Sequence, residues 1–74
     1  MNSIMPITFL DEGSIVKIKE IILSEILCKR IKSMGFNIGE SIQIIKNDGA
    51  NLILGVGESR IALSFGMAQK ILAE

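Results

Sequence analysis

The sequence predicts a mostly-β fold with two α-helices, in which the strands curl into a small, partly open barrel. Three observations support this prediction. Hydrophobic residues make up 49% of the 74 residues, and isoleucine, a β-branched residue that favours strands, dominates them. Several segments alternate apolar and polar side chains, as half-buried strands do. Short turns join the later segments, so consecutive strands should pair antiparallel.

The N-terminal part of the chain is predicted to be a lead-in followed by a first strand. Residues 1–10 form an extended lead-in whose last apolar side chains cover one end of the core. These side chains are Ile7, Phe9 and Leu10. After a turn at residues 11–13 the pattern alternates, with Val16 and Ile18 on one face and lysines on the other. This alternation predicts a half-buried strand over residues 14–22.

A helix is predicted over residues 24–34, in the connection that follows the first strand. Ser24 can cap its N-terminus, and Glu25 and Lys29 have the spacing of a surface ion pair. Gly35 can end the helix in the left-handed conformation. Apolar residues recur at the spacing of one helical face, which we expect to pack inward and plug one face or end of the barrel. These residues are Leu23, Ile26, Leu27, Ile31 and Met34.

The C-terminal half is predicted to hold three more strands and a short helix. Phe36 anchors the chain on the core before the alternation returns. The strands are expected around Ile42 and Ile44, over residues 51–56 and over residues 59–63, with turns at 47–49 and 57–58. Gly55 suits a bend or a close backbone approach in mid-strand. Ser64 can cap the last helix, whose apolar residues are Met67, Ala68, Ile71 and Leu72.

The composition argues against most enzyme chemistries. The chain has no histidine, which is the commonest general base and metal ligand at neutral pH. Its single cysteine, Cys28, supplies neither a disulfide nor a thiolate zinc site, and is expected to be a half-buried hydrophobe. Eight acidic residues balance eight basic ones, which argues against a nucleic-acid binder. We therefore expect a non-enzymatic protein with no cofactor and no metal of its own.

No segment has the composition of a membrane span or a signal peptide. Strictly apolar runs do not exceed three residues, whereas a bilayer span needs about 20 predominantly apolar residues. A basic stretch followed by an apolar one does not open the chain. We expect a cytoplasmic protein without direct membrane insertion.

Five short motifs, taken in their order and spacing, resemble the ferrous iron transport protein A (FeoA) family. They lie at residues 10–13 (L-x-x-G), 30–42 (R-x-x-x-hydrophobic-G-F-x-x-G-x-x-hydrophobic), 51–54, 59–63 (containing R-I-A-L) and 67–71. The resemblance covers about residues 8 to 73. Gly49-Ala50 and Glu12-Gly13 depart from the Gly-Pro and Pro-Gly of that family, and both departures fall in turns.

This resemblance implies a fold, a function and a partner. The fold is a single SH3-like barrel domain over residues 1–74. The function is that of a small cytosolic accessory or regulatory protein of ferrous iron uptake. The partner is the cytosolic GTP-binding domain of the ferrous iron permease (FeoB). The resemblance leaves open whether the protein stimulates GTP hydrolysis, gates the pore or assembles the permease.

Four residues are the candidates for partner binding. Ile45 and Ile53, like Ile15, fall on the strand face opposite the core residues, and apolar side chains exposed there form a contact surface. Arg60 begins an otherwise apolar strand, so its charge must point outward or pair with Glu58 or Asp48 nearby. Arg30 belongs to a basic cluster on the outward side of the helix.

Two other functions compete with the interaction module. The principal alternative is a metal-responsive or transition-metal-binding domain, similar to the SH3-like C-terminal domain of iron-dependent repressors. The absence of histidine and the scattered positions of the acidic residues count against it. A small barrel that binds nucleic acid is the other, and the neutral charge and absent Tyr and Trp count against it. Weak self-association through an apolar edge also stays open.

Overall fold

A computed structural model of the chain describes residues 3–74. Over these residues the elements are β1 (Met5–Pro6), a 3₁₀ helix η1 (Ile7–Phe9), β2 (Ile15–Ile21), α1 (Glu25–Ser33), β3 (Ser41–Asn47), β4 (Asn51–Val56), β5 (Ser59–Ser64), α2 (Phe65–Ala68) and β6 (Ile71–Ala73). The predicted strands at residues 14–22, 51–56 and 59–63 are confirmed to within one residue at each end.

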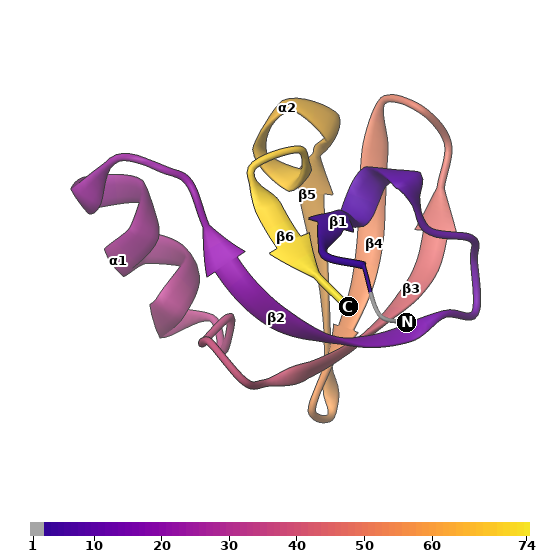
Figure 1. The fold of residues 1–74 in the computed structure, drawn as a ribbon, viewed down its shortest axis with the longest axis horizontal. Helices are drawn as coiled ribbons and strands as arrows, with labels where there is room; N and C mark the ends of the chain where they lie inside the picture. Colours follow the sequence, from indigo (N-terminus) through magenta and orange to yellow (C-terminus); the bar gives the residue numbers. More distant parts are fainter. Residues whose placement is uncertain (1–2) are drawn as a thin grey trace.

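The strands form one antiparallel, curled sheet in the order β1-β6-β2-β3-β4-β5 (Figure 1). The outermost strands of this order, β1 and β5, do not pair with each other, so the barrel stays partly open, as predicted. The long strands β3, β4 and β5 follow one another through tight turns. At the first turn Gly49 has a φ of 85°, a conformation that glycine adopts without steric cost.

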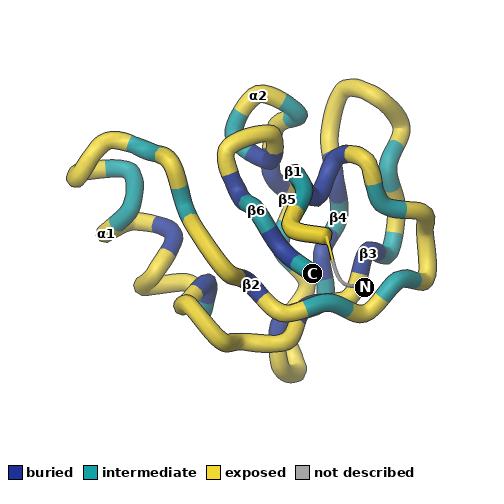
Figure 2. The backbone as a smooth tube through the Cα atoms, in the orientation of Figure 1, coloured by how far each residue is buried: buried dark blue, intermediate teal, exposed yellow. Residues whose placement is uncertain are grey.

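The core fills the inside of this curled sheet. Strand residues that point inward alternate with outward ones, and Figure 2 shows buried positions alternating with exposed or half-buried ones along β3 and β4. The largest fully buried side chains are Phe36, Ile7, Ile18, Ile31, Ile42, Ile44, Leu52, Leu54 and Ile71. The prediction that Phe36 anchors the chain on the core is therefore confirmed.

The ends of α1 are formed by the residues that the sequence predicted. The Ser24 hydroxyl accepts a hydrogen bond from the backbone N–H of Leu27 (3.3 Å), which caps the helix. Gly35 follows the helix with a φ of 101°, and its N–H donates to the carbonyl of Lys32 (3.0 Å). Glu25 and Lys29 form the expected surface ion pair at 3.9 Å.

The prediction that α1 plugs the barrel is wrong, but the predicted inward face is confirmed in part, because Ile31 belongs to the core, Leu23 packs against it and Leu27 is half-buried. Figure 1 shows α1 standing beside the sheet, joined to it through its two connections. Of its nine residues only Ile31 is fully buried, while Ile26 is 78% exposed and Met34, at the C-cap, is 37% exposed. α1 therefore contacts the core through only part of one face.

The C-terminal helix is shorter than predicted, and a strand replaces its second half. α2 ends at Ala68, and Ile71 and Leu72 belong to β6. Ile71 and Ala73 are buried whereas Leu72 between them is half-buried, which is strand periodicity. β6 pairs with both β1 and β2, so it supplies hydrogen-bond partners that neither strand finds elsewhere.

The lead-in is extended only in part. Met5 and Pro6 form β1, and the chain then turns through η1. Ile7 is fully buried and Leu10 packs against the core, as expected, but Phe9 points to solvent. The part of this prediction that concerns residues 1–2 lies outside the described residues.

Candidate partner-binding site

The outer surface of strands β2 to β5 brings together most of the residues proposed for partner binding. In the strand register Ile15 pairs with Gln43, Gln43 with Gly55, and Gly55 with Arg60. Residues directly opposite each other on neighbouring strands share one face of a sheet. This row therefore crosses four strands on the side away from the core. Together with Ile45 and Ile53 we call it the outer face.

Gly55 forms the floor of the outer face. A methyl group at this position would lie 3.3 Å from Cδ1 of Ile45 and 3.7 Å from Cβ of Gln43. The Ile45 side chain thus lies over the bare backbone of β4. The register of β3 and β4 shifts between Ile44 and Lys46, so Ile45 sits at an irregularity, where strands often re-aim a side chain. The sequence predicted a bend or a close backbone approach at Gly55, whereas the neighbours that approach it here are the side chains of Ile45 and Gln43.

A shallow, open pocket lies over the same floor. Its volume is about 320 Å³, and Ile15 and Gln43 line it together with the backbone around Gly55 and Gly57. Glu40 contributes the one ionisable side chain among its lining residues. The pocket is thus an apolar depression with an amide and a carboxylate at its sides, which suits an apolar side chain of a partner.

The apolar residues of the outer face differ in their exposure. Ile15 is 70% exposed, whereas Ile45 and Ile53 are half-buried against their neighbours. The sequence placed all three on the face opposite the core, and the structure agrees. Ile45 and Ile53 present only part of their surface, because the bulge region and the flanking strands cover the rest.

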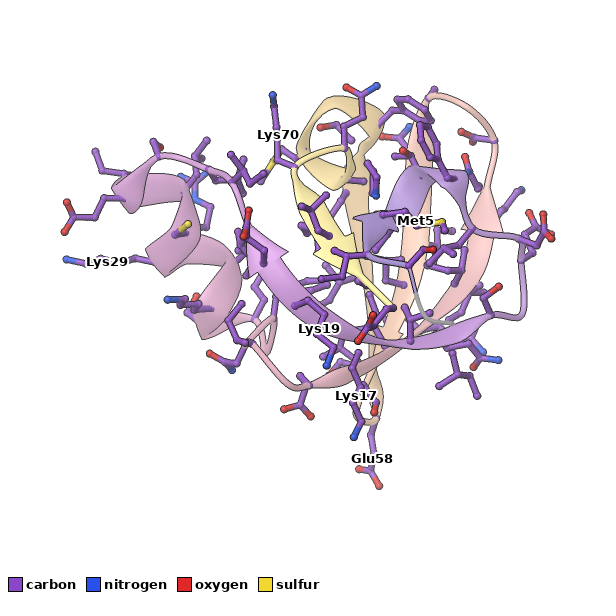
Figure 3. All side chains as sticks on the ribbon, viewed as in Figure 1. Met5, Lys17, Lys19, Lys29, Glu58 and Lys70 are labelled. Atoms are coloured by element: carbon purple, nitrogen blue, oxygen red, sulfur yellow. The ribbon has the colours of Figure 1, made fainter. Side chains whose placement is uncertain are left out.

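The two candidate arginines lie on different parts of the molecule. Arg60 is exposed on β5, in register with Gly55, and makes no ion pair within residues 3–74; neither Glu58 nor Asp48 reaches it. Figure 3 shows Glu58 directed away from the barrel at the tip of the β4–β5 turn. Arg30 is exposed on α1 and does not belong to the outer face.

The β3–β4 turn at one end of the outer face is fixed by its own side chains. Asp48 Oδ1 accepts hydrogen bonds from the backbone N–H groups of Asn51 (2.8 Å) and Ala50 (2.9 Å). These bonds stabilise the charged carboxylate and lower the pKa of Asp48, with a smaller contribution from Lys46. Asn47 Oδ1 likewise accepts from the N–H of Gly49 (3.1 Å). The turn holds β3 and β4 in the register that the outer face needs.

Residues 3–74 contain no group of three or more His, Cys, Asp or Glu side chains that could hold a metal ion. Cys28 is half-buried, as predicted, and its thiol donates to the carbonyl of Leu23 (3.4 Å). Over the same residues no helix is long and apolar enough to cross a membrane.

The sequence did not single out Gln43 or Glu40, and it did not reveal the pocket. The sequence does indicate that Gln43 faces outward, because it lies between Ile42 and Ile44, which face the core. Its alignment with Ile15 and Arg60 depends on strand register, which a single sequence does not fix.

The fold and the outer face define a small SH3-like β-barrel with a surface suited to a protein partner. The model of the FeoA domain family matches residues 5–74, and the chain belongs to this family. A Methanocaldococcus jannaschii protein designated Fe(2+) transport protein A is 36% identical over 69 residues, which cover 93% of this chain and 84% of that protein.

Solved structures share the same fold. A crystal structure of an iron uptake regulatory protein (FeoA) superposes with a TM-score of 0.90 at 22% identity, covering 97% of both chains. The iron(II) transport protein A of Clostridium thermocellum gives a TM-score of 0.87 at 29% identity, over 95% of this chain and 44% of that one. A manganese-dependent transcriptional repressor gives 0.86 at 10% identity, over 99% and 42%. This last likeness concerns the fold alone.

Proposed function

We propose that this chain is a small cytoplasmic accessory protein of ferrous iron uptake that binds the cytosolic GTP-binding domain of the permease FeoB. Membership of the FeoA family supports the process, and the relative named for Fe(2+) transport supports it further. The outer face supports binding of a protein as the mode of action. The chain acts without catalysis, through contact alone.

The observation that carries this proposal is the row from Ile15 to Arg60. The exposed Ile15 lines an open pocket there, the half-buried Ile45 and Ile53 lie on the same face, and an arginine without an ion pair within residues 3–74 stands at the end of the row. Apolar surface flanked by polar groups is typical of protein interfaces, and arginine is enriched in them. An apolar side chain of the partner fills the pocket, and Arg60 pairs with a carboxylate beside it.

Calorimetric titration into the purified GTP-binding domain of the cognate FeoB, with and without nucleotide, tests the proposal. Saturable heat is expected, and Ile45→Lys or Arg60→Ala should weaken binding about tenfold. Ile4→Lys and Lys70→Ala are the controls, because they change an isoleucine and a basic residue at exposed positions outside the outer face. Circular dichroism of each variant checks that it folds.

Mixing without heat at about 100 μM, well above the Kd of a functional complex, would contradict the proposal. The alternative function, a metal-responsive domain like that of iron-dependent repressors, rests on a likeness of fold. It predicts saturable binding of Fe(2+) by the chain alone, which a ferrous titration under reducing conditions measures. Metal binding without FeoB binding would favour that alternative.

A further inference from the structure

Four of the seven large hydrophobic side chains that are exposed within residues 3–74 lie on α1 or within five residues of its ends, away from the outer face. Two of them, Ile26 and Met34, flank Arg30 at intervals of four residues, so these three residues lie on one side of the helix. Ile22 (52% exposed) precedes the helix and Ile38 (57% exposed) follows it, beyond the serine cap and the positive-φ glycine that end the helical spacing. We call Ile26, Arg30 and Met34 the α1 stripe.

Within residues 3–74, neither Ile26 nor Met34 belongs to the core or packs against it. Ile31, on another side of the helix, is the residue that fixes α1 to the core. Figure 2 shows α1 mostly as exposed or half-buried backbone. Exposed apolar side chains that share one side of a helix form a contact surface that a partner can cover.

The positive charge of Arg30 limits the kind of partner that can cover the α1 stripe. It lies in the middle of the α1 stripe, between Ile26 and Met34, and makes no ion pair within residues 3–74. The neighbouring Lys29 is engaged by Glu25 at 3.9 Å, and Figure 3 shows Lys29 directed away from the barrel. An occupant that covers the apolar side chains must therefore also neutralise one central guanidinium group.

We propose that the α1 stripe is a docking site for an acidic amphipathic helix of a partner protein. Apolar residues of that helix pack beside Ile26 and Met34, and an Asp or Glu between them pairs with Arg30. Arginine and a carboxylate can form two parallel hydrogen bonds, which fix the register of the two helices. This surface is separate from the outer face, and the inference does not depend on FeoB as the partner.

The position of Arg30 argues against two other occupants. A second copy of the chain, packed stripe against stripe about a two-fold axis, would bring Arg30 close to its own copy and bury two like charges. A membrane surface prefers cations at the rim of an apolar patch, where they reach the headgroups. Insertion of the α1 stripe would instead draw a central arginine toward the hydrocarbon.

Two synthetic helical peptides test this inference. Each has about 18 residues, a length that permits a helix, with leucines along one face and either Glu or Lys at the centre of that face. The ¹⁵N-labelled full chain is titrated with each peptide, and backbone amide shifts are followed by NMR. The Glu peptide should cause saturable shifts confined to residues 22–38, and the Lys peptide should not.

Charge reversal provides the decisive comparison. Arg30→Glu should weaken binding of the Glu peptide at least about tenfold and create binding of the Lys peptide. Lys32→Glu is the matched control, since it makes the same charge change about 160° away around the helix and should leave both results unchanged. Shifts that persist in Arg30→Glu would overturn the inference, as would the absence of any saturable shift.

The competing occupants are tested with the same protein. Light scattering over a range of concentrations detects a second copy, and co-sedimentation with phosphatidylglycerol vesicles detects a membrane surface. The inference predicts a monomer and no sedimentation beyond that of neutral phosphatidylcholine vesicles. Dimerisation lost in Ile26→Lys, or binding to anionic vesicles lost in the same variant, would assign the α1 stripe to that other occupant and overturn the proposal.

Discussion

The barrel and α1 use the same aliphatic residue in opposite ways. In the barrel, Ile42 and Ile44 are buried with almost no exposed surface, whereas Ile26 on α1 is among the most exposed residues of its kind. A strand of the curled sheet has the core on one side, so every second side chain is inside. A helix beside the sheet meets it along one line, and most of its surface stays free. The location of an element, more than its hydrophobicity, decides whether isoleucine builds the core or a contact surface.

The largest effect should come from the same substitution made in the two regions. Ile44→Ala removes a fully buried side chain and should lower the free energy of unfolding by about 2–5 kcal/mol. Ile26→Ala removes an exposed one and should change it by less than about 0.5 kcal/mol. Chemical denaturation measures both. Ile44→Val, with an expected loss of about 0.5–1.5 kcal/mol, serves if Ile44→Ala does not fold.

Equal losses in Ile44→Ala and Ile26→Ala would contradict the division between core and contact surface. A large loss in Ile26→Ala alone would mean that α1 packs inward after all.

Truncation of the single buried residue of α1 should separate the two regions. Ile31→Ala should release the helix from the core, so that its amides exchange with solvent at least about tenfold faster. Amides of β3 and β4 should keep most of their protection, because these strands form their hydrogen bonds with each other and with β2 and β5. Hydrogen exchange followed by NMR measures both sets. A parallel loss of protection in the barrel would show that α1 and the barrel unfold as one unit.

A substitution at Gly35, where α1 joins the barrel, should have a smaller effect on the free energy of unfolding. Gly35 has a φ of 101°, and a methyl group there would lie 3.0 Å from Cγ1 of Val56. Gly35→Ala should therefore cost about 1–2 kcal/mol of stability, from the left-handed backbone and the contact together. Gly39→Ala is the matched control: its φ is 90° and no atom lies within 4 Å of the added methyl group. It reports the backbone cost alone, and an equal loss in both variants would exclude the contact with Val56.

The smallest expected effect is on the pH dependence of stability, through the carboxylate of Asp48 in the β3–β4 turn. The pKa of Asp48 is lowered in the folded state by hydrogen bonds from Asn51 and Ala50, so its ionised form stabilises the fold. This contribution is present above the ordinary pKa of 3.8 and is lost as the pH falls through the lower folded value. The difference in Tm between the native chain and Asp48→Ala should accordingly shrink below pH 3.8. A difference that stays constant down to pH 2 would show that the charge of Asp48 contributes nothing.

Local signals predicted most of the strands, both helix caps and the turns. Alternation identified the core side chains Ile18, Ile42 and Ile44, because period-two patterns say directly which face is buried. The helical spacing of apolar residues in α1 was a less reliable guide. It predicted an inward face, and Ile31 is buried, yet Ile26 and Met34 are exposed. A helical pattern shows that apolar residues share a side, but it does not show what lies beside them.

Long-range pairing explains what else the sequence missed. β6 was predicted as helix because Ile71 and Leu72 continue the apolar pattern of α2, and only their pairing with β1 and β2 makes them a strand. The outer face was predicted in part: Ile45, Ile53 and Arg60 were named, but their assembly around Gly55 depends on register across four strands. Arg30 was named with them although it lies on a different surface.

The most direct test of the outer face is an NMR titration of the ¹⁵N-labelled chain with the GTP-binding domain of FeoB. As a group, the amide signals of the outer face should shift or broaden, namely those of Ile15, Gln43, Ile45, Ile53, Gly55 and Arg60. Signals of the distant Ile4 and Lys70 should stay unchanged. Perturbations confined to α1, or none at saturating concentrations, would contradict the assignment of the outer face as the site of partner binding.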